Sequence, residues 1–100
     1  MLEAARLVRS YVSGRQRPDL DSDTMLRDAV IRQLEVLGEA AARASDGTRS
    51  ANPAIPWASI VGMRNELIHA YHRVDLDIVW RTAIEAIPQL AGALETMGVE

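Results

Sequence analysis

Residues 21–44 read DSDTMLRDAVIRQLEVLGEAAARA, and this stretch decides the fold. Apolar residues recur in it every three or four positions, which is the spacing of an amphipathic helix. The apolar positions that share one face are Leu26, Val30, Leu34, Leu37 and Ala41. The run of Asp21, Ser22 and Asp23 offers several candidate N-caps, so we expect a long helix that reaches about Ala44.

A glycine interrupts this predicted helix at position 38. Glycine inside a helix costs roughly 1 kcal/mol relative to alanine, so its presence calls for a structural reason. The missing side chain would let the backbone of another helix come close. We therefore expect a second helix to cross at Gly38.

The same periodicity predicts a helix on each side of this segment. The first runs from about Leu2 to Ser13. Its apolar stripe is formed by Leu2, Ala5, Val8 and Val12. The third helix begins near Trp57, directly after Pro56, and runs to about Tyr71, because proline is well placed to open a helix.

A fourth helix is expected after a short turn. Asp75 can cap its start, and the helix then continues to about Thr96, with a kink near Ile87 because Pro88 removes a backbone donor. Residues 45–56 are rich in Ser, Asp, Gly and Pro and show no periodicity, so they are expected to form a loop. The sequence therefore predicts an all-α, largely antiparallel, up-and-down bundle of about four helices.

Length and composition limit the classes of protein that this chain can belong to. One hundred residues form a single domain, 1–100, with a small core that self-association would complete, so a homodimer is expected. The absence of cysteine excludes disulfides and thiolate metal sites. No signal-like or membrane-spanning apolar run is visible, so we expect a soluble, cytoplasmic protein without membrane contact. The net charge of -3 means that any RNA contact must be local.

The densest group of potential catalytic side chains is MRNELIHAYHR, residues 63–73. On an ideal helix Asn65, His69 and His72 share one stripe, and Arg64 lies on the adjacent stripe with Tyr71. Arg64 and His69 are then about 140° apart around the helix axis. A second copy of the chain could bring two Arg/His sets into one cleft.

An imidazole beside a guanidinium suits RNA cleavage without a metal ion. Histidine can move the proton of a 2'-hydroxyl, and arginine can neutralise charge that develops on the phosphate. Asn65 could hold the imidazole or contact the phosphate. Metal-ligand spacings, glycine-rich phosphate loops and nucleophile-elbow serines are missing, so we expect neither a metal nor a cofactor.

Each of these residues also has a purely structural interpretation. Spacing of the Arg-x-x-x-x-His kind arises easily by chance in a chain with eleven arginines, so His69 could be an ordinary helix-end histidine. His72 is most simply a surface or helix-terminal cation. Trp57 and Trp80 are expected to pack in the core.

The motif region resembles one known family. The segments Ile55-Pro56-Trp57, Gly62-Met63-Arg64-Asn65, Leu67-Ile68-His69, Tyr71 and Ile78-Val79-Trp80 closely resemble the signature of HepT-like HEPN proteins. Leu37-Gly38-Glu39-Ala40-Ala41 resembles the motif on that family's second helix. Two features depart from the family: the first helix is short, and Glu66 places a carboxylate beside the proposed site.

The resemblance implies an HEPN-like bundle that dimerises around the motif helix and acts as a metal-independent endoribonuclease. Arg64 and His69 match the catalytic pair, Asn65 the supporting polar residue, and Tyr71 the motif tyrosine. The implied setting is a type VII-like toxin–antitoxin pair in phage defence or plasmid maintenance. Its antitoxin is a minimal nucleotidyltransferase of the MntA kind, which transfers AMP to that tyrosine. The alternative is a non-catalytic helical module that docks and regulates the nucleotidyltransferase.

Overall fold

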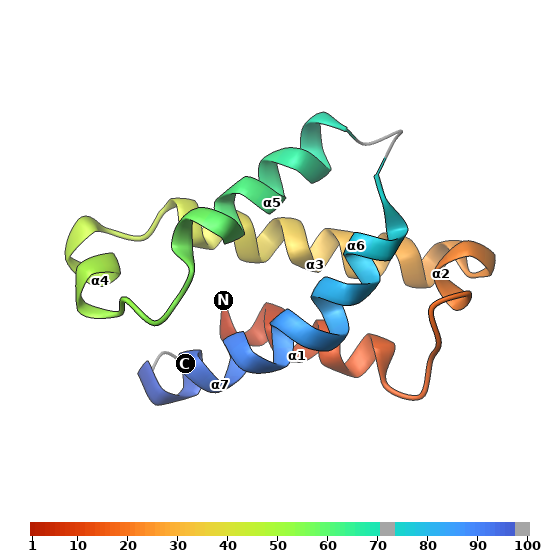
Figure 1. Cartoon of the computed structure of the whole chain (residues 1–100), viewed down its shortest axis with the longest axis horizontal. Helices are drawn as coiled ribbons and strands as arrows, with labels where there is room; N and C mark the ends of the chain where they lie inside the picture. The colour runs from red at the N-terminus through yellow and green to blue at the C-terminus, as the bar shows by residue number, and fades with distance from the viewer. Residues whose placement is uncertain (71–73, 98–100) are drawn as a thin grey trace.

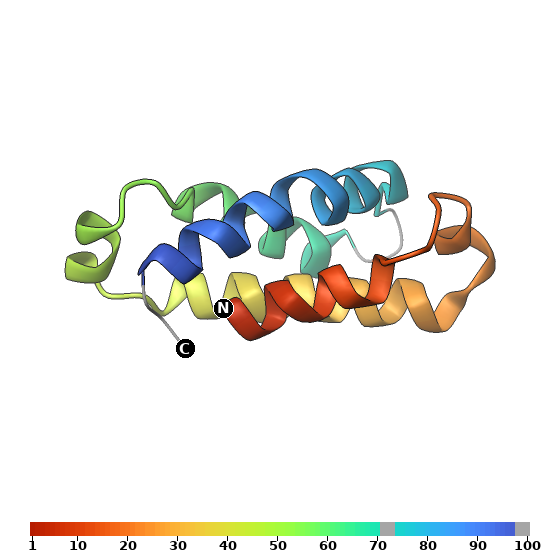
Figure 2. The ribbon, with the colours of Figure 1, turned by 90° about the horizontal axis from the view of Figure 1, so that it is seen from below.

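The computed structural model describes residues 1–70 and 74–97, and every regular element among them is helical. The elements are α1 (Leu2–Val12), α2 (Asp19–Ser22), α3 (Thr24–Ala42), α4 (Asp46–Ala51), α5 (Trp57–His69), α6 (Leu76–Arg81), the π-helical segment η2 (Thr82–Ala86) and α7 (Ile87–Met97). α1, α3, α5 and the continuous α6–η2–α7 segment run alternately in opposite directions (Figures 1 and 2). The predicted all-α antiparallel bundle is confirmed.

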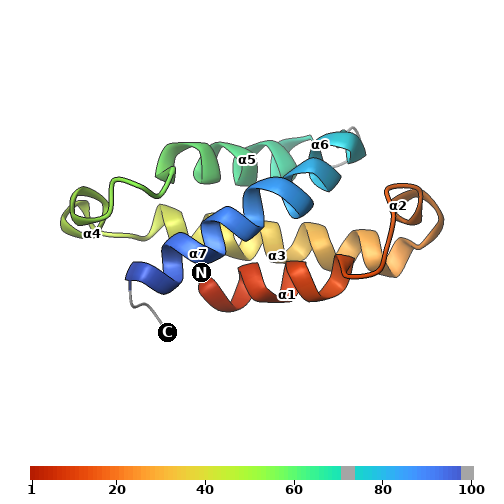
Figure 3. The same cartoon turned by 60° about the horizontal axis from the view of Figure 1, so that its bottom comes forward.

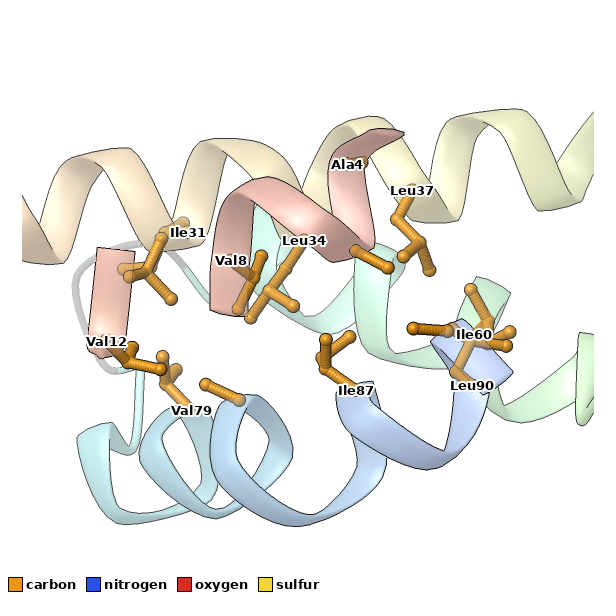
Figure 4. Packing of buried hydrophobic residues seen from close by; sticks show 14 of the residues in the cluster. Ala4, Val8, Val12, Ile31, Leu34, Leu37, Ile60, Val79, Ile87 and Leu90 are labelled. Atoms are coloured by element: carbon orange, nitrogen blue, oxygen red, sulfur yellow. The ribbon is translucent and has the colours of Figure 1, made fainter. Parts of the chain in front are cut away.

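The long helix α3 lies at the centre of the bundle. α1 and α5 both pack on α3, while α7 packs on α1. Every position of the two predicted apolar stripes is buried. Val8 of α1, Leu34 of α3 and Ile87 of α7 point into the shared core (Figure 4). The spacing of the apolar residues in α1 and α3 therefore determines which face each helix buries.

Among the candidate caps of α3, Asp23 takes the role. Its carboxylate accepts a hydrogen bond from the backbone N–H of Leu26 at 3.0 Å and another from Nη2 of Arg15 at 2.7 Å. Asp21 instead belongs to α2, a four-residue helix in the connection where no helix was predicted. A single turn is too short to show apolar periodicity, which explains the omission.

The prediction that residues 45–56 form a loop is wrong for half of the segment, because α4 occupies Asp46–Ala51. Ser45 caps α4 by accepting from the backbone N–H of Thr48 at 3.1 Å. Arg49 of α4 donates to the carbonyls of Ala41 and Ala42 at 3.0 and 3.2 Å, which satisfies the end of α3. α4 buries no residue of its own, so no apolar pattern could reveal it.

The expected kink at Pro88 takes the form of a π-helical segment just before it. The backbone N–H of Ile87 donates to the carbonyl of Thr82, five residues earlier. Proline lacks an N–H, and its ring would clash with the carbonyl four residues before it, so the preceding turn widens. The start of this segment is as predicted, because Asp75 caps α6 by accepting from the N–H of Asp77 at 2.9 Å.

The close crossing predicted at Gly38 is confirmed. A Cβ built on Gly38 would collide with the Cβ of Arg64 on α5, and it would lie 2.7 Å from the Cγ of Arg64 and 3.2 Å from the carbonyl oxygen of Ile60. Any side chain at position 38 would therefore clash with residues of the facing helix α5.

Gly38→Ala should destabilise the chain by about 1–3 kcal/mol, because two helices must separate to admit the methyl group. Gly92→Ala is the matched control, since Gly92 lies in α7 and no described neighbour lies within 4 Å of an added Cβ. That substitution should stabilise the chain by about 0.5–1 kcal/mol through helix propensity. Urea unfolding followed by circular dichroism measures both changes. Equal stability of the two variants would contradict the crossing described above.

The cap of α3 should make stability depend on acidity. The hydrogen bond from Arg15 lowers the pKa of Asp23 below its ordinary value. The carboxylate therefore stabilises the fold above the pKa of the unfolded chain, about 3.9, and this contribution is lost as pH falls through the lower folded pKa.

Asp23→Asn should be less stable than wild type at about pH 7, and the gap should narrow toward about pH 3. Thermal melts across this range measure the gap. In an Arg15→Gln background the narrowing should be smaller, because the main cause of the lowered pKa of Asp23 is gone. A gap that stays constant with pH would show that Asp23 acts as a cap without this charge effect.

Candidate functional site

Helix α5 presents the motif residues, and its start is firmly anchored. Trp57 is buried, and its indole N–H donates to the carbonyl of Asn52 at 3.0 Å, as expected for a core aromatic ring. Ile60 and Leu67 fix the inward face of α5. These three buried side chains set the rotation of α5 about its axis. Trp80, the other aromatic ring that was predicted to pack in the core, is only partly buried.

Arg64 lies at the crossing of α3 and α5. Its stem passes over Gly38, and only 22% of its side chain is exposed. Its Nη1 is 3.4 Å from Oε2 of Glu39, the residue after that glycine, and its buried Nε has no hydrogen-bond partner among the described residues. Oε1 of Glu39 also pairs with Nη2 of Arg43 at 3.1 Å. The site therefore contains one carboxylate shared between two guanidinium groups.

Asn65 and His69 are exposed on a different face of α5. Neither side chain forms a hydrogen bond or an ion pair with a residue in the ranges 1–70 and 74–97. Within these ranges, therefore, no hydrogen bond links Arg64 to His69. This arrangement follows the helical geometry expected from the sequence, in which Arg64 and His69 are about 140° apart. A single copy of the chain thus holds the two candidate catalytic groups on separate faces.

Tyr71 and His72 lie outside the described residues, and so does Arg73. The predicted roles of Tyr71 as a modified residue and of His72 as a surface cation stay predictions. Glu66 itself is exposed and forms no ion pair with a residue in the described ranges.

An apolar groove of about 560 Å³ lies between α5 and the α6–η2–α7 segment. Its walls include the buried residues Ile60, Leu67 and Ile87, and Glu66 and Asp75 also line it. Figure 3 shows α5 and α6 along one edge of the bundle, with α1 along the opposite edge. Neither Arg64 nor His69 lines the groove, whose two carboxylates make it unsuitable for RNA phosphates.

The pairing of Glu39 with Arg64 was missed in the sequence. A signal existed, because the glycine at position 38 predicts a helix crossing and position 39 lies next to that crossing. The partner helix could not be identified from periodicity alone. In the part of the chain that the structure covers, no three histidine or acidic side chains are grouped as metal ligands would be. No helix in that part is long and apolar enough to cross a bilayer.

The family model and the similar proteins point to the same family. The family model described as "Ribonuclease HepT-like" matches residues 1–97. A Thermococcus cleftensis protein named "Probable ribonuclease HepT" is 37% identical over 95% of this chain and 86% of its own length. A Methanocaldococcus jannaschii protein named "Putative RNase" is 34% identical over 95% of this chain and 87% of its own length. No solved structure matches significantly.

Proposed function

This chain belongs to the ribonuclease HepT-like family, and on that premise we propose that it is an endoribonuclease toxin of a toxin–antitoxin pair. One observation carries the proposal. The family match covers residues 1–97, and within it α5 keeps the arginine, asparagine and histidine of the motif at positions 64, 65 and 69. Asn65 and His69 are open to solvent, where an RNA strand can reach them.

The proposed reaction uses the ribose next to the cleaved bond. The imidazole of His69 accepts the proton of the 2'-hydroxyl while that oxygen bonds to phosphorus. The bond from phosphorus to the 5'-oxygen breaks, and the leaving oxygen receives a proton from a second acid. Arg64 stabilises the charge that accumulates on the phosphate oxygens. The products are a 2',3'-cyclic phosphate and a free 5'-hydroxyl, and the balance of this step requires no metal ion.

A homodimer around α5 supplies what one copy lacks. Arg64 turns toward α3 while His69 faces away, so a second copy is needed to bring an acid, a base and a guanidinium into one cleft. Large apolar side chains are exposed on α5 and beyond it, including Ile68, Ile78 and Ile84. Burying such residues between two copies would stabilise the dimer.

The alternative is a non-catalytic module that docks a nucleotidyltransferase and regulates it. The apolar groove beside α5 favours this second function, because such a surface fits protein better than nucleic acid. The acidic composition of the chain points the same way.

Replacing either catalytic group should abolish cleavage in a dimeric protein. We expect His69→Ala and Arg64→Gln each to lower the rate at least about 100-fold, as loss of a general base or charge stabiliser does. Glutamine keeps an aliphatic stem over Gly38, so the helix crossing survives. Arg81→Ala is the control, since Arg81 is exposed and forms no ion pair within the described ranges.

The assay follows cleavage of a labelled single-stranded oligoribonucleotide, with light scattering to report the oligomeric state. Cleavage should persist in EDTA, spare an all-DNA oligonucleotide and leave 2',3'-cyclic phosphate ends. Wild-type cleavage rates in both variants would exclude the Arg/His mechanism and favour the docking module. A monomer at micromolar concentration would exclude the dimer cleft.

Tyr71 is the proposed control point of the toxin. An MntA-like nucleotidyltransferase would transfer AMP from ATP to its hydroxyl and release pyrophosphate. The added phosphodiester would repel RNA and block the cleft. Co-expression with such an enzyme should add 329 Da increments, which are about the mass of one AMP residue, to the peptide that contains Tyr71.

The matched control uses the only other tyrosine of the chain, Tyr11. Tyr11→Phe should still be modified and silenced, whereas Tyr71→Phe should escape both effects. Peptide mass spectrometry locates the modification. Silencing of the toxin with Tyr71 unmodified would show that the partner neutralises by binding alone.

A further inference from the structure

Glu39 is the acidic residue nearest the guanidinium of Arg64 in the described part of the chain, at 3.4 Å from Nη1. It follows Gly38, whose missing side chain allows Arg64 to approach α3. The two neighbouring positions of α3 thus act on one side chain of α5. Gly38 leaves room for the stem of Arg64, and Glu39 contacts its charged end.

Arg64 has few other restraints on its charged end. Its Nε is shielded from solvent and has no hydrogen-bond partner, and no backbone carbonyl accepts a hydrogen bond from its guanidinium in residues 1–70 and 74–97. An arginine side chain has many rotamers, and a phosphate is bound well only by a guanidinium in a defined orientation. The carboxylate of Glu39 is therefore the group that defines this orientation.

A carboxylate so close to a phosphate site would ordinarily weaken RNA binding. Arg43 offsets this effect, because its Nη2 lies 3.1 Å from the other carboxylate oxygen of Glu39. The side chain of Arg43 is 78% exposed, so its charge also faces solvent. The three side chains together keep one net positive charge, and Glu39 can orient Arg64 without cancelling the attraction for phosphate.

We propose that Glu39 is a positioning residue for RNA cleavage, which holds the guanidinium of Arg64 in the orientation that the reacting phosphate requires. This inference rests on the proposed ribonuclease function. Because Glu39 acts on the orientation of Arg64 and not on the RNA, its loss should affect turnover more than substrate binding.

The test compares four variants by their kinetics on a random-sequence single-stranded oligoribonucleotide that carries a fluorophore and a quencher. Glu39→Ala should lower kcat by about 10- to 100-fold, with KM changed by less than about threefold. Glu39→Gln keeps an acceptor oxygen in the same place and should recover part of the lost kcat. Arg64→Gln should be inactive, and combining it with Glu39→Ala should cause no further loss.

Glu35→Ala is the matched control. Glu35 lies one turn earlier on α3 and forms no ion pair within the described ranges, so its removal changes the net charge equally without touching Arg64. Its kcat should equal that of wild type. Circular dichroism and thermal melts of each variant separate a loss of turnover from a loss of folded protein.

Three results would overturn the positioning role. They are a wild-type kcat in Glu39→Ala, a loss of kcat no larger than the loss of folded protein, and a Glu39→Gln variant no better than Glu39→Ala. If Arg64→Gln is inactive while Glu39→Ala matches wild type, only this inference fails. If wild type does not cleave the probe, or Arg64→Gln cleaves as fast as wild type, the proposed function fails with it.

Discussion

The contact on which the rest of the structure depends is the crossing of α3 and α5 at Gly38 and Arg64. A side chain at position 38 would occupy the space of the Arg64 stem, so the two helices can approach only because position 38 is glycine. This approach brings Ile60 and Leu67 of α5 into the core that α1 and α7 share with α3. The same approach places the motif arginine beside a carboxylate of α3. One missing side chain thus determines both the packing of the two helices and the environment of Arg64.

The position of α5 on α3 has a second consequence. α5 packs chiefly on α3, while α7 packs chiefly on α1, so the fourth side of the bundle stays open as the apolar groove. Glu66 and Asp75 line this groove, whereas Arg64 lies on the other side of α5 and does not line it. The two sides of α5 therefore differ in chemistry: one carries the ion-paired guanidinium of Arg64, and the other lines an apolar groove.

The sequence was sufficient for the features that repeat along the chain and insufficient for the others. The apolar stripes of α1 and α3, the Asp75 cap and the crossing at Gly38 could all be predicted, because spacing and residue type determine them. α2 and α4 could not, because helices of four and six residues are too short to show apolar periodicity. The pairing of Arg64 with Glu39 depends on which helix lies opposite α5, and local sequence does not encode that choice.

Most of the arginines in the described residues are held by partners within the chain. Arg6, Arg15, Arg17 and Arg27 each pair with a carboxylate, and Arg49 binds the end of α3, so their charges serve the fold. Arg9, Arg32 and Arg81 have no ion pair in residues 1–70 and 74–97, and a few scattered charges on an acidic surface attract polyanions weakly.

Within the described residues, two arginines pair with the same carboxylate only at Glu39, so under the proposed ribonuclease function this cluster is where an RNA phosphate would be held. The local excess of positive charge there is small, which favours weak and short-lived binding of RNA over tight binding. A toxin with this charge pattern would depend on geometry at Arg64 and His69, and not on bulk attraction, to choose the bond that it breaks. Its activity would consequently be more sensitive to small rotations of α5 than to the net charge of the chain.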